Sequence, residues 1–74
     1  MKKVRLNITS VSEALDIFNK LLDESKDEFV LINEDESKQS DPKTYIGVIY
    51  ALSEFDEIYL VNKTNDGIFP EFIK

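Results

Sequence analysis

The chain has 74 residues, a net charge of −6 and a hydrophobic content of 42%. This length predicts a single domain over residues 1–74, and the apolar content argues against wholesale disorder. The negative charge makes nucleic acid and anionic membrane surfaces poor partners, and no apolar run approaches the roughly 18 residues of a membrane span. The absence of cysteine excludes disulfides and thiolate zinc sites. We therefore expect a cytoplasmic protein.

The first half of the chain predicts a strand, a helix and a second strand. Apolar side chains alternate with polar ones over residues 4–8, which is typical of a strand with one buried face. Ser10 and Glu13 have the spacing of a capping box, so a helix should begin near residue 11. Its apolar stripe continues toward Ser25. Residues 29–32 are an apolar run of strand length.

The middle of the chain predicts a turn, a weak strand and a second helix. Residues 34–36 are acidic and interrupt the apolar pattern, and residues 38–40 could add a short polar edge strand. Asp41 has the character of a helix cap, with Pro42 at the first helical position. This second helix should end near Ser53.

The last third predicts one more strand, at residues 58–61, and a tail without a full helix. Only four residues follow Pro70, which is enough for about one helical turn. The apolar residues of the tail cannot all find cover, together with those of the second helix, in so small a core: Ile68, Phe69, Phe72 and Ile73. The order βαββαβ predicts an α+β fold, a sheet covered on one face by helices.

Two segments together resemble the HPr family, the small phosphocarriers of the bacterial sugar phosphotransferase system. They are Asn-Ile-Thr-Ser-Val at 7–11 and Lys-Thr-Tyr-Ile-Gly-Val-Ile-Tyr-Ala-Leu at 43–52. The resemblance implies an HPr-like open-faced β-sandwich, here with a truncated C-terminal helix. It places Thr44 on the family's regulatory phosphorylated serine, and Ile46 and Ile49 on exposed methionines that family members use to bind partners.

The residues that carry phosphoryl transfer in the family motif are missing from this chain. Ser12 stands at the position of the phosphorylated histidine, and Ala14 and Leu15 replace the arginine and proline beside it. The chain contains no histidine, so Ser12 has no imidazole base to activate it as a nucleophile. We therefore expect a protein without catalytic activity, and the sequence contains no zinc motif, calcium loop or glycine-rich phosphate loop that would indicate a metal or cofactor. The alternative for Ser12 is an ordinary first-turn helix residue.

Two features of the second helix have open interpretations. Thr44 suits a phosphate, because free amides and the helix dipole attract anions, yet it could equally be a tolerated threonine. Ile46, Ile49 and Tyr50 lie together at helical spacing, with Tyr45 expected on another side. They could form a partner-binding surface or belong to the core.

We therefore expect a regulatory or protein-binding module related to the sugar phosphotransferase system, with an unidentified protein partner and no enzymatic activity. One alternative is a phosphoacceptor in signalling that a kinase modifies at Thr44 or Ser12. Another is a small structural homodimer of ferredoxin-like fold, which has the same coarse element order. The fold alone does not separate these functions.

Overall fold

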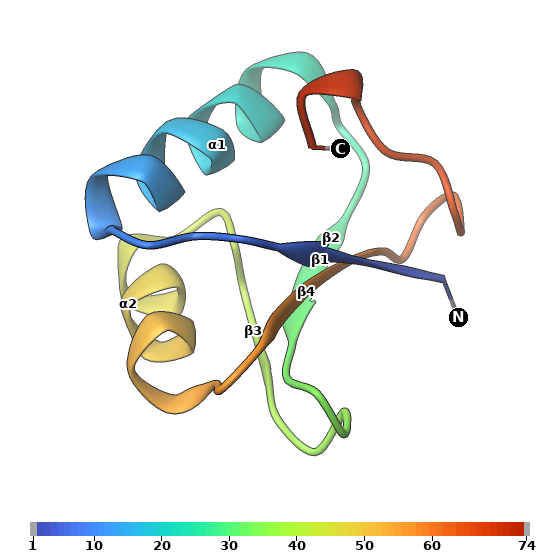
Figure 1. Cartoon of the computed structure of the whole chain (residues 1–74). Helices are drawn as coiled ribbons and strands as arrows, with labels where there is room; N and C mark the ends of the chain where they lie inside the picture. Colours follow the sequence, from blue (N-terminus) through green and yellow to red (C-terminus); the bar gives the residue numbers. More distant parts are fainter. Residues whose placement is uncertain (1, 74) are drawn as a thin grey trace.

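Two helices lie against one face of a four-stranded antiparallel sheet (Figure 1). The computed structural model describes residues 2–73. The predicted α+β class and the βαββαβ order are confirmed. The elements are β1 (Lys3–Leu6), α1 (Val11–Glu24), β2 (Phe29–Ile32), β3 (Gln39–Ser40), α2 (Tyr45–Glu54), β4 (Ile58–Asn62) and the short 3₁₀ helix η1 (Glu71–Ile73).

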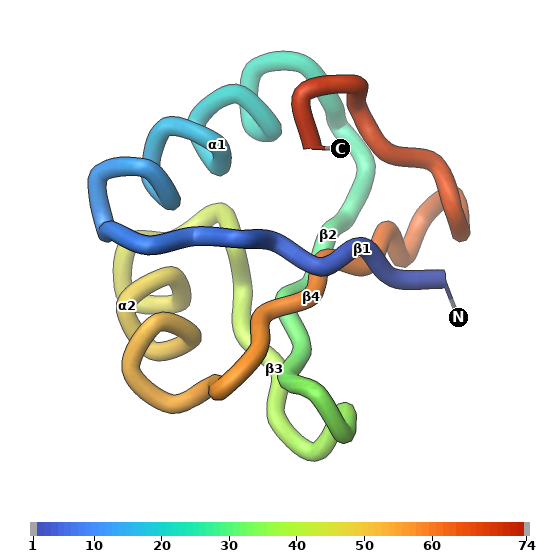
Figure 2. The backbone as a smooth tube through the Cα atoms, viewed as in Figure 1, coloured from blue at the N-terminus to red at the C-terminus, as the bar shows by residue number. Residues whose placement is uncertain are grey.

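The strand order is β1-β4-β2-β3, so the last strand of the chain lies inside the sheet. β4 pairs antiparallel with both β1 and β2, and its residue Leu60 lies opposite Val4 on one side and Leu31 on the other. Figure 2 shows the N-terminal segment running beside β4. Each strand–helix–strand connection therefore skips one strand. β1, near the start of the chain, joins the sheet through its pairing with β4, near the end of the chain.

Helix α1 begins where the capping-box pattern predicts. The Ser10 hydroxyl accepts a hydrogen bond of 3.1 Å from the backbone N–H of Glu13, and the helix starts at the next residue, Val11. Its last residue is Glu24, and the N–H of Ser25 closes the final turn on the carbonyl of Leu21. Both ends are therefore set by local hydrogen bonds that satisfy terminal backbone groups.

Helix α2 begins three residues later than predicted, and its cap is Thr44 instead of Asp41. The Thr44 hydroxyl accepts a 3.0 Å hydrogen bond from the N–H of Gly47. The Asp41 carboxylate instead accepts a 2.9 Å bond from the N–H of Lys43, which closes a local turn. An aspartate that binds its own backbone two residues on favours a turn over a helix start. Pro42 therefore lies in this turn, outside the helix.

The glycine in α2 is explained by a close approach within the chain. A Cβ at Gly47 would overlap the carbonyl oxygen of Asp41 and lie 2.7 Å from the Thr44 hydroxyl oxygen. Ser40 reinforces this contact, since its hydroxyl donates a 2.6 Å hydrogen bond to the Gly47 carbonyl. The loop between β3 and α2 is therefore pressed against the first turn of the helix.

The core lies between the helices and the inward face of the sheet. Ala14, Phe18 and Leu21 face it from α1, and Val48 and Ala51 face it from α2. The sheet contributes Leu6, Phe29, Leu31, Ile58 and Leu60. Alternate residues of each strand point inward, as expected for a sheet with one covered face.

The opposite face of the sheet also buries apolar residues, although the helices lie on the other side. Val61 and Ile32 belong to this face and are almost fully buried. Lys3 lies directly opposite Val61 in the ladder, and its ammonium is 4.4 Å from the centre of the Tyr59 ring. Lys3 also pairs with Glu36 at 3.7 Å. Long side chains of the sheet and its hairpin thus shield this face.

The core covers most of the apolar tail residues, but not all of them. Ile73 is buried in the core, and Phe69 and Phe72 are half-buried against it. The tail returns past the C-terminal end of α1 (Figure 1), where the Lys20 ammonium lies 5.9 Å from the Phe72 ring centre. Of the four apolar tail residues, Ile68 alone stays exposed. A single 3₁₀ turn is therefore enough to bring the tail onto the core.

Candidate functional site

Four apolar side chains of α2 form an exposed surface, which we call the α2 patch: Tyr45, Ile46, Ile49 and Tyr50. They line a hollow of about 250 Å³. Ile46 is 81% exposed, Tyr45 62% and Tyr50 42%, whereas Ile49 is half-buried. Three exposed large apolar residues on one short helix need an explanation, because contiguous apolar surface usually marks an interaction site.

The arrangement of the patch corrects one prediction from the sequence. Tyr45 lines the hollow of the patch, although the sequence separates it from Ile46; it also lines a second hollow together with Val48, which is buried in the core. Tyr45 and Ile49 are four residues apart, as are Ile46 and Tyr50. The patch therefore consists of two parallel i, i+4 ridges with a groove between them. Residues at this spacing are neighbours on a helix surface.

Tyr50 is held in place at one end of the patch. Its ring makes an edge-to-face contact with Phe55, with ring centres 5.7 Å apart and an angle of 83° between the planes. Phe55 is itself buried in the core. Such aromatic pairs add about 0.5–1.5 kcal/mol beyond the area that they bury. One wall of the groove is therefore anchored to the core.

A second hollow adjoins the patch between the two helices. Its volume is about 230 Å³, and it is bounded by Leu22 of α1 and by Tyr45 of α2, with Phe18 and Val48 among its other lining residues. Leu22 is 55% exposed. Tyr45 lines both hollows. The α2 patch and Leu22 together form a continuous surface across both helices, which we call the apolar strip.

The two predicted phosphorylation positions lie at different helix starts. Ser12 is exposed in the first turn of α1, where Ser10 supplies the cap. Thr44 is exposed as the cap of α2, and its hydroxyl oxygen lies 3.5 Å from the Asp41 carbonyl oxygen. A phosphate on Thr44 would meet the free amides of the first turn, but the hydroxyl already has a structural role there.

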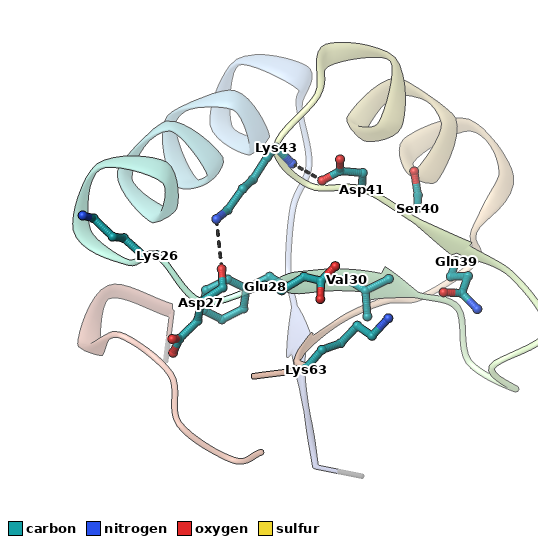
Figure 3. A pocket seen from close by; sticks show the side chains of 10 residues that line it. Lys26, Asp27, Glu28, Val30, Gln39, Ser40, Asp41, Lys43 and Lys63 are labelled. Atoms are coloured by element: carbon teal, nitrogen blue, oxygen red, sulfur yellow. Dashed lines mark hydrogen bonds between the residues drawn. The ribbon is translucent and has the colours of Figure 1, made fainter. Parts of the chain in front are cut away.

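A more polar groove of about 490 Å³ opens between the start of β2 and the loop before α2 (Figure 3). Its potentially reactive groups already have internal partners. The Lys43 ammonium donates a 2.9 Å hydrogen bond to the Asp27 carbonyl, and the Ser40 hydroxyl donates to Gly47. The side chains of Lys26 and Lys63 point away from each other in Figure 3. The groove therefore lacks the convergent charges that would hold an anion.

Shifts in pKa have local structural causes. Hydrogen bonds from Asn62 and Asn65 lower the pKa of Asp27, and Ser37 lowers that of Asp35. A hydrogen bond to Glu57 raises the pKa of Tyr59. Each shift moves the group away from neutral pH, whereas general acid–base catalysis needs a pKa near the operating pH. These groups are poor candidates for proton transfer.

Neither a metal centre nor a membrane span is found in residues 2–73. No group of three or more His, Cys, Asp or Glu side chains in that range could hold a metal ion. No helix in it is both long and apolar enough to cross a bilayer. The apolar strip therefore stands out as the candidate site.

Sequence reasoning missed two members of this strip. Leu22 fits the apolar stripe of α1 and looks like a core residue, but it is exposed, whereas its neighbour Leu21 is buried in the core. From the sequence alone we expect Tyr45 on another side of the helix from Ile46. The spacing of four residues between Tyr45 and Ile49 is a signal that Tyr45 belongs to the same surface.

No protein-family model, curated protein or solved structure matches this chain. Its function is therefore inferred from the residues and contacts of the chain itself.

Proposed function

We propose that this protein is a non-enzymatic HPr-like module that binds another protein through the α2 patch. The observation that carries this proposal is the 81% exposure of Ile46 on a helix face that bears no charge from Tyr45 to Ser53. Leaving a large aliphatic side chain in water forgoes about 1.5–3 kcal/mol that its burial would contribute. A partner that covers the patch would recover this free energy.

The strand order supports an HPr-like sheet over the ferredoxin-like alternative. In a ferredoxin-like sheet the first and third strands are the central pair. Here β1 and β3 are the edge strands, and β4 and β2 lie between them.

The chemistry of the chain supports binding over phosphotransfer. The resemblance places the phosphoryl acceptor at Ser12, and the chain has no histidine. A phosphoserine is a stable ester that does not pass its phosphoryl group onward as a phosphohistidine does. A regulatory role near the sugar phosphotransferase system follows from the resemblance, and the location that it implies is the cytoplasm.

A second candidate function is that of a phosphoacceptor, and the exposure of Thr44 favours it. The added charge of −1.5 to −2 would be attracted by the helix dipole. The modification would also lie next to Tyr45, at the edge of the α2 patch. Phosphorylation could in this way control the same surface.

Affinity purification with matched variants tests the binding function. The bait is the whole protein, either native or carrying Ile46→Glu or Ile68→Glu. Ile68 is the matched control, because it is also aliphatic and 62% exposed but lies in the tail. We expect one stoichiometric partner with the native protein and with Ile68→Glu, and its loss with Ile46→Glu. Circular dichroism should show all three folded. Identical partners for all three baits would contradict the proposal.

A further inference from the structure

We infer that the apolar strip receives an amphipathic helix of positive charge from the partner, an inference that rests on the proposed function. Tyr45 separates the two hollows of about 250 and 230 Å³, so the strip offers two adjacent sites for apolar side chains. A helix presents such side chains at i and i+3 or i+4. This spacing suits two neighbouring hollows on either side of one tyrosine.

The shape of the α2 patch favours a helix as the occupant. Its two ridges, Tyr45–Ile49 and Ile46–Tyr50, follow the i, i+4 rows of α2. The groove between two such ridges accepts a ridge of a second helix, which is the commonest way in which helices pack. A peptide that binds as an added strand would instead need a free sheet edge to pair with.

The size of the strip favours a single helix over a folded domain or a second copy of this chain. The strip consists of five side chains, of which Ile49 is already half-buried. A standard interface between folded proteins uses about 20–30 residues on each side. Two copies would also bring together two molecules that each carry a charge of −6, which disfavours their association.

Charges at the ends of the strip predict the charge of the occupant. Asp23 and Glu24 follow Leu22 at the C-terminal end of α1, and Glu54 ends α2 beyond Tyr50. Neither helix has a basic residue in its last turn, where the dipole is also negative.

The nearby cations do not reverse this balance. Lys38 pairs with Glu54 at 3.7 Å, so these two charges offset each other. The Lys43 ammonium keeps its charge at the edge of the second hollow while it donates to the Asp27 carbonyl. The two carboxylates at the end of α1 outnumber this one cation. Lys26 lies past the end of α1 and is exposed. An uncharged strip with acidic ends, on a molecule of charge −6, is complementary to an apolar ridge flanked by lysine or arginine.

Model peptides provide the direct test. The probe is a labelled 16-residue peptide of leucine and lysine whose leucines lie on one helical face. One control peptide has the same composition in scrambled order, and a second has glutamate in place of every lysine. Fluorescence anisotropy measures binding to the native protein, to Ile46→Asn and to the matched control Ile68→Asn. These substitutions leave the net charge unchanged, so they do not alter general electrostatic attraction.

We expect the leucine–lysine peptide to bind the native protein and Ile68→Asn with equal affinity, and Ile46→Asn about tenfold more weakly. The scrambled and glutamate peptides should each bind at least tenfold more weakly than the leucine–lysine peptide. Equal binding of the scrambled peptide, or no effect of Ile46→Asn, would overturn the docking of a helix on the strip. Equal binding of the glutamate peptide would overturn the positive charge of the occupant.

Two outcomes separate this inference from the proposed function. If the peptide fails to bind but Ile46→Glu still loses a purified partner, the α2 patch binds a protein and only the helical occupant is wrong. If the peptide binds and no purified partner depends on Ile46, the proposed function fails. Sedimentation equilibrium should show a monomer. A dimer that Ile46→Asn dissociates would overturn the inference in favour of a second copy.

Discussion

The side-chain nitrogen of Asn62 donates a 2.9 Å hydrogen bond to the carboxylate of Asp27, which joins the end of β4 to the loop between α1 and β2. The same nitrogen donates to the carbonyl of Ile68 at 2.9 Å. Its side-chain oxygen accepts from the N–H groups of Thr64 and Asn65. The amide thus uses its full hydrogen-bonding capacity in a site where Asn62 is 1% exposed.

Asn62→Ala should lower the free energy of unfolding by about 2 kcal/mol or more. The substitution removes the part-buried hydrogen bonds to the Ile68 carbonyl and to two backbone N–H groups, together with the bond to Asp27, and each such bond contributes about 0.5–1.5 kcal/mol. Urea denaturation measures the change. The control is Asn7→Ala at an exposed asparagine, which should change stability by less than about 0.5 kcal/mol. Equal effects would mean that the Asn62 network does not stabilise the fold.

Protonation of Asp27 at low pH should lower the free energy of unfolding. Hydrogen bonds from Asn62 and Asn65 lower its pKa in the folded state below the ordinary value of 3.8. A lowered pKa means that the ionised carboxylate stabilises the fold above pH 3.8, and that this contribution is lost as the pH falls through the lower folded pKa.

Urea unfolding between pH 2 and pH 6 checks this dependence. Asp27→Asn should be less stable than the native protein at pH 6, and the difference should shrink as the pH falls below about 4. Asp35→Asn is a useful comparison, because Ser37 also lowers the pKa of Asp35. A constant difference between native protein and Asp27→Asn across this range would show that the charge of Asp27 is not what matters.

Gly47→Ala should destabilise the protein, although glycine to alanine in a helix usually stabilises by about 1 kcal/mol. The new methyl group would overlap the Asp41 carbonyl and crowd the Thr44 hydroxyl. Relieving the overlap requires a shift of backbone, for which about 1–3 kcal/mol is typical. Thermal unfolding measures the sign. Ser53→Ala, at an exposed position of the same helix, should be neutral or stabilising.

Thr44→Ala should lower stability by about 1 kcal/mol through loss of the α2 cap, and Thr44→Ser should retain most of it. If a kinase of the HPr-associated type recognises this helix start, mass spectrometry should find the phosphate on Thr44. Ser40 is a poor competitor, because its hydroxyl is bonded to the Gly47 carbonyl. Phosphate on Ser40 or Ser53 would remove the special role of Thr44.

Local patterns in the sequence determined most elements of this protein. The capping pair Ser10 and Glu13 set the start of α1, and the apolar run at residues 29–32 became β2 with the same bounds. Asp66-Gly67 is a typical turn pair, and Gly67 has a φ of 84°, which a glycine adopts without strain. In each case the residues that decide the outcome lie within a few positions of one another.

Only the tertiary structure decided which apolar residues stay exposed and how the chain ends are held. Tyr45 and Leu22 come together because α1 and α2 pack side by side, and nothing in either segment alone indicates that contact. The packing of Ile73 in the core and the bond from Asn62 to Asp27 also depend on contacts that are remote in sequence. The sequence around a hydrophobic residue looks the same whether or not a remote element covers its side chain. The strand order, with β4 between β1 and β2, decides which residues are covered.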